Sequence, residues 1–120
     1  MRVHLLKSKL HRATVTGASL DYEGSLTIAE DLIELAGLLP YEKILCSNMA
    51  NGARWETYVI VGPRGSGAIE LNGAVARLGQ PGDRLTIMAF AEVEATSVSH
   101  WKPQVVLLGP GNHPVEASHA

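Results

Sequence analysis

The 120-residue chain is poor in aromatic and sulfur-containing residues. It has one phenylalanine, two tryptophans, three tyrosines and a single cysteine, Cys46, whereas 46% of its residues are hydrophobic. The core must therefore be mainly aliphatic, and an internal disulfide is excluded because there is no second cysteine. Since the residues around Cys46 are typical of a strand, we expect its thiol to be a small buried hydrophobe.

Long apolar runs and a strong net charge are also missing. No stretch approaches the roughly 20 apolar residues that cross a bilayer, and basic residues between positions 7 and 12 interrupt the segment where a signal peptide would be apolar. We therefore expect a cytoplasmic protein that does not enter a membrane. The formal net charge of −2 argues against binding to nucleic acid, which usually needs a larger positive field.

Glycines and alternating residues predict many short strands. The 12 glycines stand singly, often beside Pro or Asn, and mark turns between strands. Strands are predicted over residues 3–16, 43–49, 54–61, 68–71, 84–93 and 104–108. In the first strand, strict alternation would place His11 on the same face as Ala13 and Val15.

Short helical segments and one hairpin turn complete the predicted secondary structure. Thr27 and Glu30 have the spacing of a helix capping box, and Gly37 is a plausible end for the helix that follows. A second helical piece is predicted over residues 74–78, and Asn51-Gly52 predicts a tight hairpin turn. Many short strands with one or two short helices are typical of a small, closed, mainly β barrel.

One domain is expected over residues 1–108, because the chain is long enough for one modest core. Residues 109–120 contain two glycines and two prolines, and we expect this C-terminal tail to be mobile. His113 and His119 in the tail do not have the spacing of metal ligands, and no metal-binding residues are predicted.

Gly24 and Ser25 place an unhindered carbonyl directly before a serine hydroxyl, where a strand is predicted to give way to a helix. A serine can attack the carbonyl of the peptide bond before it and turn the amide into an ester, if strain and oxyanion donors favour the ester. Elimination then leaves dehydroalanine, which hydrolyses to a ketone, the pyruvoyl group. Taken alone, however, Gly-Ser is far more often an ordinary turn.

Five separated motifs resemble pyruvoyl-dependent aspartate 1-decarboxylase in their order and spacing. They are Lys9-Leu10-His11-Arg12-Ala13-Thr14-Val15-Thr16, Tyr22-Glu23-Gly24-Ser25, Asn51-Gly52-Ala53-Arg54, Thr57-Tyr58 and Asn72-Gly73-Ala74. The resemblance extends to about Leu108. It implies a double-psi β-barrel, a homotetramer with sites at subunit interfaces, and conversion of L-aspartate into β-alanine and CO₂ for pantothenate synthesis.

The resemblance also implies that the chain cleaves itself between Gly24 and Ser25, into residues 1–24 and 25–120. Ser25 would become the pyruvoyl group, a covalent cofactor that forms a Schiff base with the substrate amine and accepts the charge that CO₂ leaves behind. No diffusible cofactor is needed for this reaction. Whether cleavage is spontaneous or assisted by a maturation factor stays open.

Thr57 and Tyr58 have different implied roles. Thr57 would form a hydrogen bond near the Gly24 carbonyl during processing, and Tyr58 would donate a proton after CO₂ leaves. Adjacent residues of a regular strand point to opposite faces, so these roles require either a bulge or a site shared between subunits. On residue type alone, both could equally be strand residues that serve packing.

Arg54 suits a substrate carboxylate because its planar guanidinium can donate two parallel hydrogen bonds. A surface arginine beside a hairpin turn is the alternative. Through the resemblance, the implied substrate-binding residues are Lys9, His11, Tyr22, Arg54, Thr57, Asn72, Gly73 and Ala74. At the turn that contains Gly73, the missing side chain would let the substrate approach the backbone closely.

Three residues, Asp21, Ser47 and Val75, depart from the family's usual pattern. They leave the processing residues intact but keep the substrate open, so decarboxylation of another acidic amino acid is the first alternative. A non-catalytic barrel that binds DNA or a protein partner is the second, and it predicts an uncleaved chain.

Overall fold

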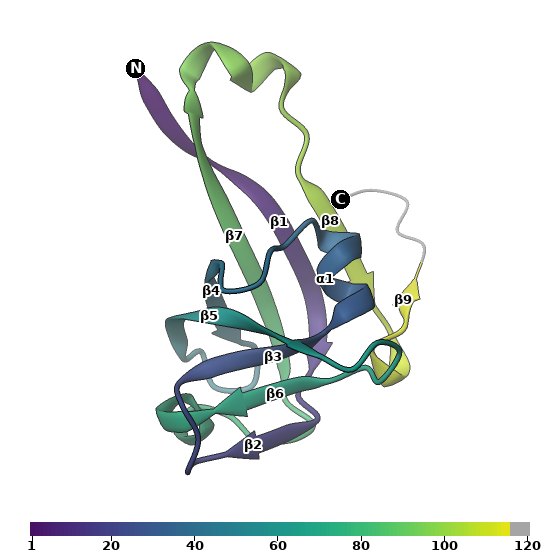
Figure 1. Ribbon diagram of the computed structural model, residues 1–120. Coiled ribbons are helices and arrows are strands. Elements are labelled where there is room, and N and C mark those ends of the chain that lie inside the picture. The colour runs from purple at the N-terminus through teal and green to yellow at the C-terminus, as the bar shows by residue number, and fades with distance from the viewer. Residues whose placement is uncertain (116–120) are drawn as a thin grey trace.

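The computed structural model describes residues 1–115, which form mainly strands (Figure 1). The strands are β1 Arg2–Thr14, β2 Gly17–Ser19, β3 Ser25–Ala29, β4 Lys43–Asn48, β5 Arg54–Gly62, β6 Ile69–Asn72, β7 Arg84–Glu94, β8 Gln104–Leu108 and β9 Pro114–Val115. The helices are α1 Glu30–Ala36 and the 3₁₀ helices η1 Gly73–Arg77, η2 Ala95–His100 and η3 Pro110–Asn112. Of the helices within residues 1–115, none is long and apolar enough to span a membrane.

The strands form one sheet in the order β2-β6-β3-β5-β4-β7-β1-β8-β9. This sheet closes because β1 and β2 follow each other along one bent segment: β1 pairs with β7, whereas β2 pairs with β6. At the bend, Val15 N donates to Asp83 O over 2.8 Å and Thr16 N donates to Ile69 O over 2.8 Å. The predicted fold, a small and mainly β barrel with short helices, is confirmed.

The interior of the barrel is aliphatic, as the composition predicts. Its largest fully buried side chains include Leu10, Leu26, Ile28, Ile44, Val59, Ile69, Leu71, Leu85 and Ile87. Removing such side chains from water is the main stabilising contribution to a fold of this size. Cys46 is buried among them, and burial raises the pKa of its thiol to about 12, so its expected role as a small hydrophobe is confirmed.

A bulge in β1 overturns the predicted alternation. The register with β7 shifts between His11 and Ala13, where Arg12 has a φ of 64°. Leu10 and Ala13 are three residues apart, yet both are fully buried. A bulge inserts one extra residue and reverses the alternation beyond it. The prediction that His11 shares a face with Ala13 is therefore wrong, and His11 lies on the outer face.

The helix begins later than predicted. Residues 25–29 form β3, which is buried along its whole length and pairs with β5 on one side and β6 on the other. Helix α1 starts at Glu30 without a side-chain cap, so the capping-box interpretation of Thr27 and Glu30 is wrong. Gly37 ends the helix at a φ of 71°, as predicted. Ser25 consequently opens a central strand and does not precede a helix.

Residues 109–115, predicted as the first part of a mobile tail, pack against the barrel. Asn112 is buried, and its Nδ2 donates to Thr14 O and Gly67 O, each over 2.8 Å. Strand β9 pairs with β8. The packed unit therefore continues to Val115, and the rest of the predicted tail, residues 116–120 with His119, lies outside the described residues.

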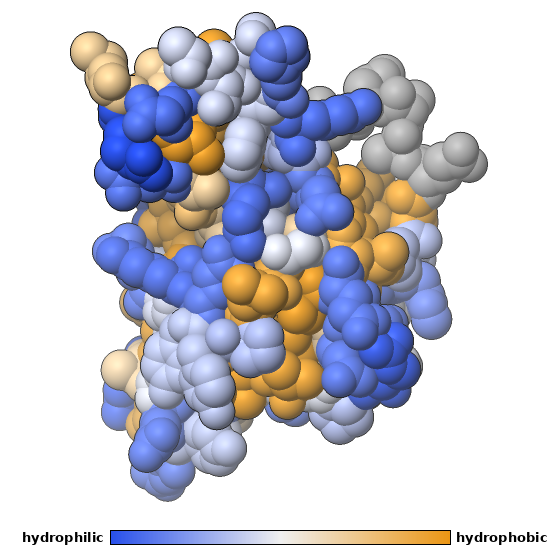
Figure 2. Space-filling model, turned by 45° about the horizontal axis from the view of Figure 1, so that its top comes forward, coloured by the Kyte–Doolittle hydropathy of each residue, from blue (hydrophilic) through white to orange (hydrophobic). Residues whose placement is uncertain are grey.

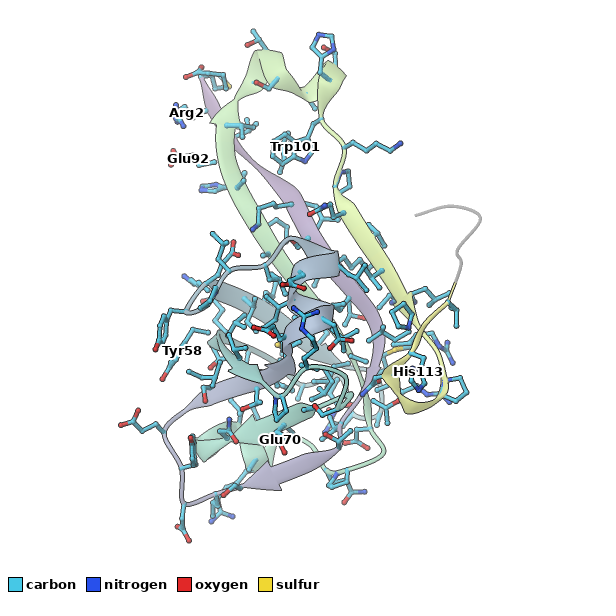
Figure 3. The ribbon with its side chains drawn as sticks, turned by 45° about the vertical axis from the view of Figure 1, so that its right-hand side comes forward. Arg2, Tyr58, Glu70, Glu92, Trp101 and His113 are labelled. Carbon is cyan, nitrogen blue, oxygen red and sulfur yellow. The ribbon has the colours of Figure 1, made fainter. Side chains whose placement is uncertain are left out.

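Strands β1 and β7 continue past the barrel as a two-stranded arm (Figure 1). Near its end Arg2 forms ion pairs with Glu92 at 3.6 Å and with Glu94 at 3.1 Å. Trp101 lies against the arm (Figure 3), and its Nε1 donates to Leu6 O over 2.6 Å. The segment that joins β7 to β8 is thereby tied to β1.

Candidate active site

Ser25 is held at the start of β3 with its side chain only 1% exposed. Its hydroxyl donates to Glu23 O over 3.2 Å and accepts from Asn72 Nδ2 over 3.0 Å. The position of Asn72 follows from the sheet, because β3 and β6 are antiparallel and Ser25 pairs directly with Asn72. The nucleophile predicted from the sequence therefore has defined hydrogen-bond partners beside the Gly24–Ser25 peptide bond.

Gly73 packs against the peptide that precedes Ser25. Its φ is 75°, and a Cβ built on it would stand 2.8 Å from Gly24 Cα, Gly24 N and Tyr22 O. No side chain fits there, so the turn requires glycine. A Cβ built on Gly24 would instead meet no atom within 4 Å. The backbone at Gly24 is therefore supported on one side and open on another, while Ala74 is exposed at the start of η1.

A hollow of about 400 Å³ adjoins this segment. It is lined by Gly17, Ala18, Ser19, Tyr22, Thr27, Glu70 and Asn72. Glu70 is the charged residue of this lining, and Figure 3 places it on β6 in the lower part of the barrel. A small polar molecule could therefore reach the buried side chains beside Ser25. Among residues 1–115, no group of three or more His, Cys, Asp or Glu side chains could hold a metal ion.

Thr57 and Tyr58 lie on opposite faces of β5, as alternation predicts. Thr57 pairs with the buried Ile44, whereas Tyr58 pairs with the exposed Lys43. Figure 3 shows the Tyr58 ring on the outside of the barrel. The pairing of β5 with β4 runs from Arg54 to Tyr58 without a shift, so β5 has no bulge there. Of the two solutions considered for adjacent residues, the bulge is thus excluded.

Both residues lie near the predicted cleavage point along the sheet. Strands β3 and β5 run parallel, with Leu26 beside Val59. One step back along both strands brings Ser25 beside Tyr58, and Thr57 directly precedes Tyr58. The register therefore brings the predicted processing residues and the predicted proton donor to one end of the β3–β5 pair.

Arg54 lies elsewhere, on the outer face of β5. It is exposed and pairs with Ser47, which pairs with Thr86, which in turn pairs with His11. Thr86 Oγ1 and His11 Nδ1 are 3.5 Å apart. Because opposed residues on neighbouring antiparallel strands point to the same side, these four residues form one outward-facing row.

Lys9 and His11 belong to the same outer face, and both are half-buried. Burial lowers the pKa of His11, and the positive charges of Lys9 and Arg12 lower it further. Strands β7, β4 and β5 lie between β1 and β3. Lys9 is therefore four strands away from Ser25 along the sheet, and the two residues lie on different sides of the barrel.

The predicted site residues therefore form two groups within one chain. The processing group, around the start of β3, the middle of β5 and the end of β6, contains Tyr22, Gly24, Ser25, Thr57, Tyr58, Asn72, Gly73 and Ala74. The outer-face group contains Lys9, His11 and Arg54. Sequence reasoning missed Thr27 and Glu70, although reading residues 25–29 as a strand would have placed Thr27 on the same face as Ser25.

Comparison with known proteins gives matches along nearly the whole chain. Residues 1–115 match the aspartate decarboxylase family. Aspartate 1-decarboxylase of Prosthecochloris aestuarii is 54% identical over 114 residues, which cover 95% of this chain and 88% of that protein. Aspartate 1-decarboxylase of Leptospira biflexa is 49% identical over 118 residues, which cover 98% of this chain and 100% of that protein. The resemblance carried by five motifs is thus confirmed, and the chain belongs to the aspartate decarboxylase family.

Proposed function

We propose that this chain cleaves itself between Gly24 and Ser25 and then decarboxylates L-aspartate to β-alanine and CO₂, for pantothenate synthesis. Family membership supports the reaction. The observation that carries the cleavage is the contact of Gly73 with the Gly24 backbone, next to a Ser25 hydroxyl that Asn72 holds. Together these contacts support a cleavage that uses the Gly24 backbone on one side and the Ser25 hydroxyl on the other.

The proposed cleavage needs only residues of this chain and one water. Ser25 Oγ attacks the Gly24 carbonyl carbon, the peptide C–N bond breaks, and an ester forms while the Ser25 nitrogen becomes an amine. Loss of the Ser25 α-proton and departure of the Gly24 carboxylate leave dehydroalanine. Addition of water and release of ammonia give the pyruvoyl group, on chains 1–24 and 25–120. The register of β3 and β5 supports Thr57 as the group near the Gly24 carbonyl.

The surroundings of position 25 fit a pyruvoyl group. Asn72 Nδ2, which is 3.0 Å from Ser25 Oγ, can donate to a carbonyl oxygen that replaces the hydroxyl. The open space beside Gly24 leaves room for the new chain end to move away. When present, the group supplies an electron sink for the charge that decarboxylation leaves on the α-carbon.

Tyr58 and Arg54 have separate parts in the proposed turnover. Tyr58 neighbours position 25 along the sheet and carries a phenol that can give a proton to the α-carbon. Arg54 is exposed and free to bind the second carboxylate of aspartate in bidentate form. A substrate with two carboxylates is thereby distinguished from ordinary small amino acids.

A homotetramer with shared sites explains the two groups of site residues. Lys9 and Ser25 lie four strands apart along the sheet, so in this proposal the outer-face group of one chain faces the processing group of another. The single chain also leaves apolar surface uncovered: Figure 2 shows orange hydrophobic areas between blue polar ones, and Tyr22, Leu39 and Tyr41 are all exposed. Large exposed apolar areas are typical of protein interfaces.

A maturation factor and a cytoplasmic location remain predictions. Incubating the purified, uncleaved chain alone tests the first, because a chain that needs a helper stays uncleaved until cell extract is added. Fractionation of cells that produce the protein tests the second, since the cleaved chain should then be recovered in the cytoplasmic fraction.

The proposed reaction is tested by assaying the purified protein, whose cleavage is checked by intact mass, with aspartate and glutamate side by side. We expect CO₂ and β-alanine from aspartate and a much slower reaction with glutamate. Faster release of CO₂ from glutamate would reassign the substrate to another acidic amino acid. No product from either acid, together with an uncleaved chain, would favour a non-catalytic binding barrel.

A further inference from the structure

The side-chain amide of Asn72 binds two hydroxyls of β3 at once. Its Nδ2 donates to Ser25 Oγ over 3.0 Å and to Thr27 Oγ1 over 2.8 Å. An amide nitrogen carries two hydrogens, so each hydroxyl accepts one of them. Ser25, Asn72 and Thr27 are 1%, 5% and 8% exposed, so all three partners are buried.

Thr27 has little freedom to turn away from Asn72. A Cβ built on Gly62 would stand only 2.8 Å from Thr27 Cγ2, so the threonine methyl fills the space that Gly62 leaves open. Thr27 and Gly62 lie on the neighbouring strands β3 and β5. Because a β-branched side chain has few χ1 rotamers, holding the methyl against Gly62 directs the hydroxyl toward Asn72.

We propose that Thr27 is a positioning residue for self-cleavage, acting through Asn72 on the hydroxyl of Ser25. Two hydrogen bonds to hydroxyls two residues apart fix both the place and the plane of the Asn72 amide. Without the Thr27 hydroxyl, one N–H of Asn72 is left buried and unpaired, which is unfavourable. The amide then rotates to find another partner, and Ser25 loses the contact that orients it.

This role rests on the proposed cleavage at Ser25, and it concerns the attack step rather than the chemistry that follows. A nucleophile displaced by about 1 Å can lose on the order of 10²-fold in rate. Thr27 itself does not touch the Gly24 carbonyl in this account. It determines how often the Ser25 hydroxyl is aimed correctly.

The test follows the cleavage of freshly made chain over time by intact mass. Thr27→Val keeps a methyl against Gly62 but removes the hydroxyl, and we expect cleavage to slow by roughly 10- to 100-fold. Thr27→Ser keeps the hydroxyl and should cleave at close to the wild-type rate. Wild-type speed in Thr27→Val, or equal slowing in both variants, would overturn the proposal.

A second pair of variants keeps the hydroxyl at position 27 but changes its position by substituting the neighbouring Gly62. Gly62→Ala places a Cβ against the Thr27 methyl and should slow cleavage in the wild-type background. In a Thr27→Ser background that methyl is missing, so the same Gly62→Ala change should have little effect. Slowing by the same factor in both backgrounds would show that Gly62 acts through general packing, and it would also overturn the proposal.

Hydroxylamine, which cleaves esters, locates the affected step. If attack by Ser25 is slowed, Thr27→Val should yield no more hydroxylamine-cleavable chain than wild type. Accumulation of cleavable ester would assign the defect to elimination, contrary to the proposal. A wild-type chain that never cleaves yet decarboxylates aspartate would instead refute the proposed function, so the two failures are distinguishable.

Discussion

Gly73 and Gly24 meet backbone to backbone. A Cβ on Gly73 would stand 2.8 Å from both Gly24 Cα and Gly24 N, so the turn after β6 and the peptide before β3 fit together only without a side chain there. The preceding residue, Asn72, holds the Ser25 hydroxyl. One short turn therefore supports both the Gly24 backbone and the nucleophile of the proposed cleavage.

Gly73→Ala should therefore lose cleavage as well as stability. Gly65 provides the matched control, because its φ of 78° resembles the 75° of Gly73 but a Cβ there would meet nothing within 4 Å. Both substitutions carry the cost of a left-handed backbone, about 1–2 kcal/mol, measurable by urea unfolding. Only Gly73→Ala should also slow cleavage strongly. Equal cleavage rates in the two variants would show that the contact with Gly24 does not matter.

Substitutions at the neighbouring Thr57 and Tyr58 should separate processing from turnover. Thr57→Val removes the hydroxyl that we propose to act near the Gly24 carbonyl, and should leave most of the chain uncleaved. Tyr58→Phe should cleave normally but lose about 10²- to 10⁴-fold in kcat, the usual range for one positioned proton donor. Steady-state kinetics, normalised to pyruvoyl content, provide the measurement. Full activity of cleaved Tyr58→Phe would remove Tyr58 from its proposed role.

Much of the sheet could be predicted from sequence, because its signals are local. The predicted strands agree with β1, β4, β5, β6, β7 and β8 to within about two residues at each end. Gly52 has a φ of 75° in the predicted hairpin turn, and Gly52 N donates to Asn48 O over 2.8 Å. The positive φ of this turn favours glycine whatever the rest of the fold does, so the turn can be predicted from the local sequence.

What could not be predicted depends on partners far away in sequence. The spacing of Thr27 and Glu30 suits a helix cap. The backbone of residues 25–29, however, pairs with both β5 and β6, so this segment forms a strand instead of the start of a helix. The bulge at Arg12 is likewise fixed by pairing with β7. Because its spacing to Glu30 predicts a helix cap at Thr27, the sequence does not predict the contact between Thr27 and Asn72.

Replacement of Arg54 should affect the substrate and not the cleavage. Arg54→Lys keeps the charge but loses the two-pronged geometry, and should weaken aspartate turnover by about 1.5–3 kcal/mol, the range for a hydrogen bond to a charged group. Arg54→Ala should lose more. Arg64→Ala is the control, because Arg64 forms an ion pair with Glu34 on α1 and has no proposed contact with the substrate. Wild-type kcat/KM in cleaved Arg54→Ala would make Arg54 an ordinary surface residue.

His11 should make the fold sensitive to mild acid. Its pKa in the folded chain is lowered by burial and by the charges of Lys9 and Arg12, so the unfolded chain binds the proton more readily. Stability from the neutral imidazole is present above the unfolded pKa of ~6.5 and is lost as the pH falls through that value toward the folded pKa.

Comparison with His11→Asn measures this effect. The melting temperature of the wild type relative to His11→Asn should decline between about pH 7.5 and pH 5, because only the wild type titrates at position 11. The other histidines are present in both proteins, so the comparison isolates position 11. A difference that is flat or that grows as the pH falls would contradict the inferred direction.

The intact mass of the purified protein tests the central claim most directly. Cleavage at Ser25 predicts two chains, residues 1–24 and 25–120, the longer one lighter than simple hydrolysis would give by the mass of one ammonia. Ser25→Ala should remain a single, inactive chain of 120 residues. A wild type that decarboxylates aspartate as a single intact chain, or an active and uncleaved Ser25→Ala protein, would contradict the account.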